Sequence, residues 1–317
     1  KIINNEICCD IFNYLNLYED AFLLFKGFGV AVTGPLVKGL DKGYTSLEVG
    51  TTKDTNYIEQ FFVGLLEGDG TITTNLNSNK KTICVRFVIA LKNDENNQIM
   101  LNKIQKVIGG RVVIERKDKY VTWIATSKAD INKVLLVLSR YPLLTIRKQC
   151  QLEFVKNCLL YKDINNFMSN RNNLYNKKNE LLQAKLKNQT KYIELPDYFK
   201  GWLSGFIEAE GNFSLFFNKE GKLRKSAFAI GQNEELHIFN MIKFYFQSEN
   251  KIITEKIKIS FKGKTTDSIH YRFYLYNALS RKLLFEHFKK YPLLGEKKLS
   301  YIKFFEYHNK SNLIINE

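Results

Sequence analysis

A ten-residue segment occurs twice in this chain, and each copy opens a stretch of similar length. The copies read F-F-V-G-L-L-E-G-D-G at 61–70 and W-L-S-G-F-I-E-A-E-G at 202–211. Both place small residues four positions apart, on one face of a helix; these are Gly64 and Gly68, then Gly205 and Ala209. Such a face lets two helix axes approach more closely than the usual distance of about 8–10 Å. The repeat therefore predicts two tightly packed helices.

Each copy ends in an acidic residue followed by glycine: Asp69 in the first and Glu210 in the second. A carboxylate at the C-terminal end of a helix faces the negative end of the helix dipole, which costs about 0.3–1 kcal/mol on a surface. If the helices pack in parallel, the two acids also converge and repel each other. A hard divalent cation with oxygen ligands would offset both effects. The pattern predicts a metal site at Asp69 and Glu210, together with the preceding residues Gly68 and Ala209.

Both segments resemble the signature helix of the LAGLIDADG homing endonucleases. The acids match that motif's metal-binding position, and Gly64 and Gly205 match its interface glycine. The resemblance covers residues 55–310. It implies an α+β fold of two pseudo-symmetric helix–hairpin–helix–hairpin–helix units, whose antiparallel sheets form a saddle over double-stranded DNA. It further implies a monomer that hydrolyses both DNA strands with Mg²⁺, leaving 3′ overhangs, during intron homing. Ca²⁺ is expected to support binding without cleavage.

The rest of the chain repeats in the same order behind each copy. Asp69 and Phe87 have the same separation as Glu210 and Phe228, and Y-P-L-L occurs at 141–144 and 291–294. Alternation with period two predicts strands, and apolar spacing of three and four predicts helices. The expected first-half elements are strands 71–76, 82–91, 112–115 and 120–125 and helices 101–107, 131–138 and 149–160. The expected second-half elements are strands 213–218, 223–231, 254–262 and 268–277 and helices 236–246, 281–288 and 299–308.

This duplication divides the chain into five segments. They are an irregular N-terminal leader at 1–54, a first unit at 55–160, a linker at 161–196, a second unit at 197–310 and a tail at 311–317. The linker is rich in Asn and Lys, which predicts a solvated spacer with some helix at 177–187. In the leader, Lys26, three glycines and Pro35 interrupt the apolar stretch 21–37 and argue against a membrane span. The run G-F-G-V-A-V-T-G has no third glycine at the spacing that a dinucleotide loop requires. Because the sequence begins at Lys1, we expect a processed or trimmed product.

Composition favours a polyanionic partner. The formal net charge is +16 and the pI is near 9.4, which indicates nucleic acid rather than a membrane surface, although an AT-rich gene would also raise the lysine content. Five cysteines form no C-x-x-C pair, and the four histidines are not spaced as zinc ligands, so neither disulfides nor structural zinc are expected. The leader resembles the joint to an upstream exon in intron-encoded members of the family, which suggests an organelle, the mitochondrion.

Polar residues alternate along the predicted hairpins and form a candidate DNA-binding face. Amides, hydroxyls and guanidinium groups read base edges, while lysines neutralise phosphates. An ordinary solvated sheet face would show the same alternation, but its position beside the paired acids favours DNA. The candidates are Thr73, Asn75, Asn77, Thr82, Arg86, Ser214, Asn218, Lys225, Lys256, Lys258, Ser260, Lys262 and Arg272.

Three further catalytic residues follow from the resemblance. Gln232 comes after F-A-I-G in the second half and matches a family position that orients the attacking water. The first half has Leu91 there, so this role is missing or passes to Lys92, and the two strands are expected to be cut at unequal rates. Lys297 and Arg147, which is followed by Lys148, match basic residues near the scissile phosphates.

Two other functions remain open at this point. The first is an RNA maturase that assists splicing of its own group I intron, with or without DNA cleavage. The second is a non-catalytic DNA-binding protein on the same fold. Two intact acids favour cleavage over both, because neither alternative needs a metal site.

Overall fold

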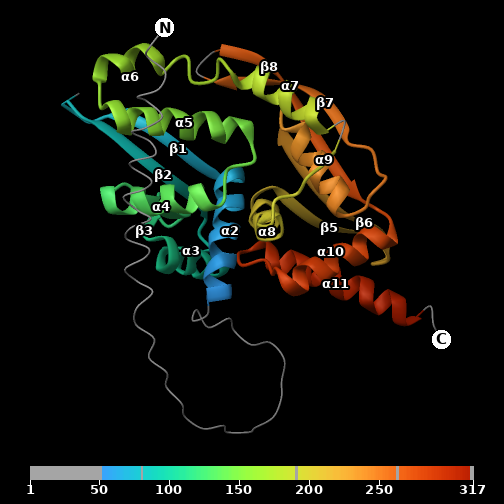
Figure 1. Ribbon diagram of the computed structural model, residues 1–317. Helices are drawn as coiled ribbons and strands as arrows, with labels where there is room; N and C mark the ends of the chain where they lie inside the picture. Colours follow the sequence, from blue (N-terminus) through green and yellow to red (C-terminus); the bar gives the residue numbers. More distant parts are fainter. Residues whose placement is uncertain (1–51, 80, 190–191, 262–263, 315–317) are drawn as a thin grey trace, which may run out of the picture. The chain divides into compact units, whose positions relative to one another are not determined.

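The computed structural model describes residues 52–79, 81–189, 192–261 and 264–314 (Figure 1). The predicted leader therefore lies outside the described residues up to position 51. Each repeat supplies one antiparallel four-stranded sheet with helices packed on one side of it. The elements of the first repeat are α2 (Thr52–Gly68), β1 (Gly70–Leu76), β2 (Ile83–Lys92), α3 (Glu95–Ile108), β3 (Arg111–Glu115), β4 (Tyr120–Ala125), α4 (Lys128–Arg140) and α5 (Ile146–Tyr161).

The second repeat has the same order of helices and strands. Its elements are α8 (Phe199–Glu210), β5 (Gly211–Phe217), β6 (Leu223–Asn233), α9 (Leu236–Tyr245), β7 (Ile253–Phe261), β8 (Lys264–Leu275), α10 (Ala278–Lys290) and α11 (Lys297–Ile314). The strand orders are β1-β2-β4-β3 and β5-β6-β8-β7, so the two sheets have identical topology. The predicted fold class and internal duplication are confirmed.

Strand alternation sets which side of each sheet is buried. In the first sheet Ile72 pairs with Phe87 and both are buried, whereas the neighbouring pair, Thr73 and Arg86, lies on the other side. In the second sheet the buried pair is Phe213 with Phe228. Successive strand residues point to opposite faces, so the apolar residues of each repeat turn toward the helices and leave the polar side uncovered by them.

The helices α2 and α8 form the centre of one continuous core that contains residues of both repeats. In Figure 1 they are the blue helix and the yellow helix beside it. Phe61, Phe62, Trp202 and Phe206 are fully buried, and the rings of Trp202 and Phe206 stack 4.7 Å apart. Burying a large apolar side chain stabilises a fold by about 1.5–3 kcal/mol, so these helices hold the two repeats together.

Glycines allow the two helix backbones to touch. A Cβ atom at Gly64 would lie less than 3.0 Å from the carbonyl oxygen of Trp202, and one at Gly205 would lie equally close to that of Phe61. Near the C-terminal ends, Gly68 faces Ala209 in the same way. The contacts advance along both helices in the same direction. The prediction of a close, parallel helix pair is confirmed.

The predicted linker is only partly a solvated spacer. It contains α6 (Ile164–Asn170) and α7 (Lys178–Gln189), and α7 contains the predicted helix at 177–187 except for its first residue. Phe167 and Leu182 are buried, and Leu182 packs against the start of α5. The sequence did not predict this packing, because each short helix buries a single large apolar residue and so shows no helical periodicity of apolar residues. At the other end, α11 continues through positions 311–314, which were assigned to the tail.

Replacing Gly205 tests the helix contact. On helix propensity alone, Gly205→Ala would stabilise the protein by roughly 1 kcal/mol. Because the added methyl group would meet the backbone of α2, we expect destabilisation by about 1–3 kcal/mol or more. Lys200→Ala on the exposed side of α8 is the matched control and should change little. The measurement is the free energy of unfolding in denaturant, and a stabilised Gly205→Ala protein would contradict the close contact.

Candidate functional site: a pair of converging acids

The two predicted acids converge where α2 and α8 end. Glu210 is the last residue of α8, and Asp69 follows α2 directly. A Cβ atom on Gly68 would lie 3.4 Å from Glu210 Oε1, which places the second acid against the end of the first helix. Burial raises the pKa of both carboxyl groups, and the charge of Asp69 adds to the effect on Glu210, whose pKa rises to about 7. The site thus brings two negative charges together, with Glu210 half-buried and Asp69 exposed to solvent.

Two lysines lie beside the acids. The Lys148 side chain is only 6% exposed, and its ammonium donates to the carbonyl oxygen of Gly70. Lys297 donates to the carbonyl oxygens of Glu208, at 2.8 Å, and Ala209. Burial lowers the pKa of Lys148 to about 8 and that of Lys297 below its usual range, while the nearby carboxylates act in the opposite direction. The centre therefore contains two acids and two cations.

The structure places Lys148, not Arg147, at the acids. Arg147 is exposed, and its described contact is made by the backbone N–H, which donates to Glu235. Successive residues of a helix point about 100° apart, so only one of these two neighbours can face the centre. Sequence spacing favoured Arg147, because Arg147 stands six residues after Tyr141 as Lys297 stands six residues after Tyr291.

Gln232 contacts the second acid, and the first acid has no counterpart at the matching position. Gln232 Nε2 donates to Glu210 Oε1 at 2.7 Å. Leu91 packs against the core, and Lys92 extends to Glu296, with 3.2 Å between Nζ and Oε1. The role considered for Lys92 is therefore not supported by its position. The two acids sit in different surroundings.

The glutamate shared by both decapeptides caps a second helix. Glu67 accepts hydrogen bonds from the backbone N–H groups of Leu144 and Thr145 and from the indole of Trp202. Glu208 likewise accepts from three N–H groups, those of Leu294, Gly295 and Lys297. The sequence showed the repeated glutamate but not its role. These bonds tie the helix pair to the starts of α5 and α11, which carry the two lysines.

In the first sheet, the predicted DNA-binding residues of the strands share the face away from the core. Thr73 lies directly opposite Arg86, and Asn75 lies opposite Cys84. Asn77 and Thr82 instead close the hairpin turn: Asn77 Oδ1 accepts from the Thr82 N–H, and Asn77 Nδ2 donates to Thr82 Oγ1. In the second repeat Asn218 does the same, accepting from the Lys222 N–H.

The second sheet separates residues that the sequence placed together. Ser214, Lys225 and Arg272 share the face away from the core. Their strand partners, which lie on the same face, are Ala227, Phe216 and Gly231, and all of them alternate with the core-side residues of their strands. Lys256 and Lys258 pair with Ile269 and Asp267, which alternate with Arg272 and share the side of the buried Phe273. These two exposed lysines therefore lie on the helix side of the sheet, and their assignment to the face that carries Arg272 is wrong. The register pairs Ser260 with Thr265, and Lys262 lies outside the described residues.

Comparisons with known proteins identify the family. The family model described as LAGLIDADG endonuclease matches residues 62–158 and 203–308. This chain belongs to the LAGLIDADG endonuclease family. The family predicted from the decapeptides is thus confirmed, as is the class of protein, an endonuclease.

Relatives of this LAGLIDADG chain are named as intron-encoded endonucleases. "Probable intron-encoded endonuclease aI3" of Dictyostelium citrinum is 36% identical over 79% of this chain and 95% of that protein. The protein of the same name from Debaryomyces hansenii is 35% identical over 78% of this chain, which spans 38% of the relative's length. "LAGLIDADG Meganuclease I-AabMI Bound to Uncleaved DNA" is similar in fold, with a TM-score of 0.56 and 18% identity over 80% of this chain and 91% of that one.

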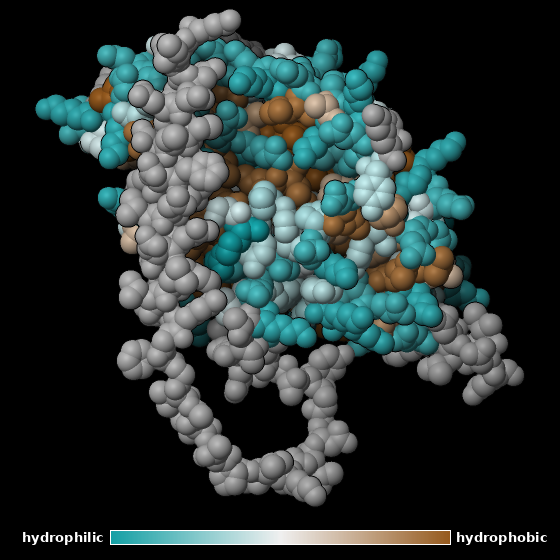
Figure 2. Space-filling view, in the orientation of Figure 1, coloured by the Kyte–Doolittle hydropathy of each residue, from teal (hydrophilic) through white to brown (hydrophobic). Residues whose placement is uncertain are grey.

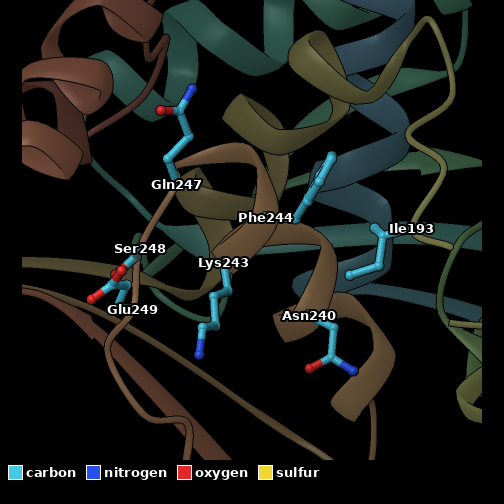
Figure 3. Close-up of a pocket in the computed structure, with 7 residues that line it drawn as sticks. All are labelled: Ile193, Asn240, Lys243, Phe244, Gln247, Ser248 and Glu249. Atoms are coloured by element: carbon cyan, nitrogen blue, oxygen red, sulfur yellow. The ribbon is translucent and has the colours of Figure 1, made fainter. Parts of the chain in front are cut away.

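Two cavities in the described part of the chain contain none of the predicted site residues. The first cavity has a volume of about 870 Å³ and is lined by parts of α4, α5, α7 and α9. Figure 2 shows an apolar hollow in the middle of the molecular face that it draws. Another of about 480 Å³ lies at the end of α9, where Asn240, Lys243 and Phe244 project from one helix (Figure 3). Within the described ranges no cluster of three or more His, Cys, Asp or Glu residues is placed to hold a metal ion, and none of the helices has the length and apolar character of a membrane span.

Glu67→Gln tests the cap on α5. All three described partners of the carboxylate are donors, so an amide can keep only the bonds to its one oxygen. Each hydrogen bond to a charged group contributes about 1.5–3 kcal/mol, and we expect the free energy of unfolding to fall by at least that much. Glu153→Gln, an exposed acid on α5, is the control and should have little effect. Equal stability of the two variants would show that the Glu67 bonds do not hold the helix start.

Proposed function

We propose that this protein is a site-specific double-strand DNA endonuclease of intron homing. The observation that carries the proposal is the convergence of Asp69 and Glu210 at the ends of α2 and α8, with Lys148 and Lys297 beside them. Carboxylates and ammonium groups in this arrangement suit the hydrolysis of a phosphodiester, because the acids can hold a cation and the lysines can bind phosphate oxygens. The names of the relatives, and the DNA in the titles of structures of similar fold, support the same function.

The acid pair fits a divalent cation. Both side chains offer oxygen ligands, and the raised pKa of Glu210, at about 7, reflects burial and repulsion by Asp69, which a cation would relieve. We propose Mg²⁺, held by Asp69 and Glu210 with help from Gly68 and Ala209. When bound, it polarises the phosphate, favours hydroxide formation and stabilises the leaving oxygen. Ca²⁺ should support binding alone; one structure of similar fold is titled "I-SmaMI bound to uncleaved DNA target in the presence of Calcium ions".

The protein's own residues have different roles in this reaction. Lys148 and Lys297 place positive charge next to the scissile phosphates and stabilise charge that develops on their oxygens. Gln232 fixes the orientation of the Glu210 carboxylate and is positioned to orient a water molecule near it. Leu91 can do neither for Asp69, so the two strands should be cut at different rates, each cut contributing to 3′ overhangs.

The DNA-binding face we propose is the uncovered side of both sheets. It includes Thr73, Asn75 and Arg86 in the first repeat and Ser214, Lys225 and Arg272 in the second. Because one chain supplies both sheets and both acids around a shared core, we propose that it acts as a monomer. A relative named "Uncharacterized mitochondrial protein RF1", from Saccharomyces cerevisiae, supports a mitochondrial location. Binding of the intron RNA remains an additional possibility to test, whereas the intact acids favour cleavage over a purely DNA-binding role.

Neutralising either acid should separate cleavage from binding. Asp69→Asn and Glu210→Gln should each abolish double-strand cleavage with Mg²⁺, or limit it to a nick, because each removes one anionic ligand. Affinity for DNA in Ca²⁺ should stay within a few fold. The measurements are cleavage of a plasmid that carries the joined exons of the host gene, with and without Mg²⁺, and binding to the same duplex. Glu286→Gln, on the exposed side of α10, is the control; normal double-strand cleavage by either site variant would refute the assignment.

Salt dependence should distinguish the two faces of the second sheet. Removing one phosphate contact flattens the slope of log affinity against log salt by roughly 0.9, which we expect for Lys225→Ala but not for Lys258→Ala. Arg272 can read a base edge, so Arg272→Ala should cost about 1–3 kcal/mol on the cognate site and relax preference there. The measurement is binding to cognate and random duplex across a salt series. A flatter slope for Lys258→Ala, with none for Lys225→Ala, would reverse the assignment of the faces.

A further inference from the structure

The starts of α5 and α11 are each held from both repeats. The first backbone N–H groups of a helix have no partner within the helix and must find one elsewhere. At α5, the N–H groups of Leu144 and Thr145 donate to Glu67 of the same repeat. The next two N–H groups, of Ile146 and Arg147, donate to Glu235 of the other repeat at 3.0 Å each.

The start of α11 repeats this division. Residues 294–297 supply four successive N–H groups, and three of them donate to Glu208 of the same repeat. The remaining N–H group, that of Glu296, donates to Asn97 Oδ1 of the first repeat at 3.0 Å. Tyrosine hydroxyls add a second exchange. Tyr198 donates to the Pro142 carbonyl oxygen, and Tyr57 donates to that of Pro292, both across the two repeats.

Glu235 holds the residue next to the site lysine. Its side chain is almost completely buried, and it lies just before α9 in the second repeat. Lys148 follows Arg147 directly and reaches the carbonyl oxygen of Gly70, the residue after Asp69. Fixing the first turn of α5 fixes the direction in which the Lys148 side chain leaves the helix. No other described contact joins the second repeat to the backbone N–H groups of this turn.

We propose that Glu235 is a positioning residue for Lys148, and that Asn97 has the same role for Lys297. This inference rests on the proposed endonuclease function. It adds that each repeat positions the site lysine that the other repeat carries. Glu235 touches neither acid in the described contacts, so it acts through Lys148. Loss of either residue should impair the strand served by its lysine and spare the other.

The two positioning residues should not have equal effects. Glu235 offers a carboxylate to two N–H groups, whereas Asn97 offers one amide oxygen to one N–H group. The larger loss is therefore expected for the Glu235 variant.

Strand-resolved cleavage tests the proposal. The substrate is a target duplex labelled separately on each strand, and the full chain carries Glu235→Ala, Lys148→Ala or both changes. We expect Glu235→Ala to slow the strand that Lys148→Ala slows most by about 10–100-fold, as misplacement of a site group does. The double variant should be no slower than Lys148→Ala, because residues that act through one another are not additive. Asn97→Ala should slow the strand that depends on Lys297, by a smaller factor.

The strand that Glu235→Ala spares is the internal control for folding, and Glu249→Ala, at an exposed acid after α9, is the matched variant. Equal slowing of both strands by Glu235→Ala, or additive losses in the double variant, would overturn the inference. If Glu235→Ala does not fold, Glu235→Gln keeps one acceptor oxygen and should give a smaller loss on the same strand. Wild-type protein that cuts neither strand of the target would overturn the proposed function as well, whereas normal wild-type cleavage with unselective variants would overturn the positioning role alone.

Discussion

The close approach of α2 and α8 is the constraint on which the rest of the structure depends. Gly64 lies against the Trp202 carbonyl group and Gly205 against that of Phe61, so neither position has room for a side chain. Large side chains beside these glycines then fill the core on both sides of the contact. The same geometry brings Asp69 and Glu210 together, because both helices end at the same point of the contact.

The converging acids are surrounded by contacts that connect the two helices to α5 and α11. Glu67 and Glu208 project from the helix pair and accept the first N–H groups of α5 and α11. Lys148 and Lys297, which lie on those helices, donate to carbonyl oxygens beside the acids. Isolated charges would be costly in this place, but each buried carboxylate here has either several donors or a cation close by. The glycine contact, the helix caps and the site therefore form one unit.

Much of the fold could be predicted from the sequence because the signals are local or repeated. The duplicated decapeptide predicted the helix pair and the acids, the repeated pattern behind it predicted the order of elements along the chain, and the family resemblance predicted Gln232 as a site residue. The failures have a common cause. Lys256 and Lys258 alternate cleanly, yet only their pairing with β8 decides which face they occupy. Likewise, Arg147 and Lys148 are neighbours in sequence, and only the tertiary structure shows which of them faces the acids. The contact of Glu235 with the other repeat is also visible only in the tertiary structure.

The two repeats differ most where they make polar contacts. Ser204 bonds to His287, whose other ring nitrogen meets Tyr245, but the matching positions of the first repeat hold Val63 and Val137. Gln232 likewise corresponds to Leu91 in the first repeat. In a symmetric homodimer every such change appears twice, because both subunits share one sequence. A single chain with two repeats is free of that restriction, so each sheet and each acid can adapt separately. That freedom suits a DNA site whose two halves differ, since symmetric proteins match palindromic sites.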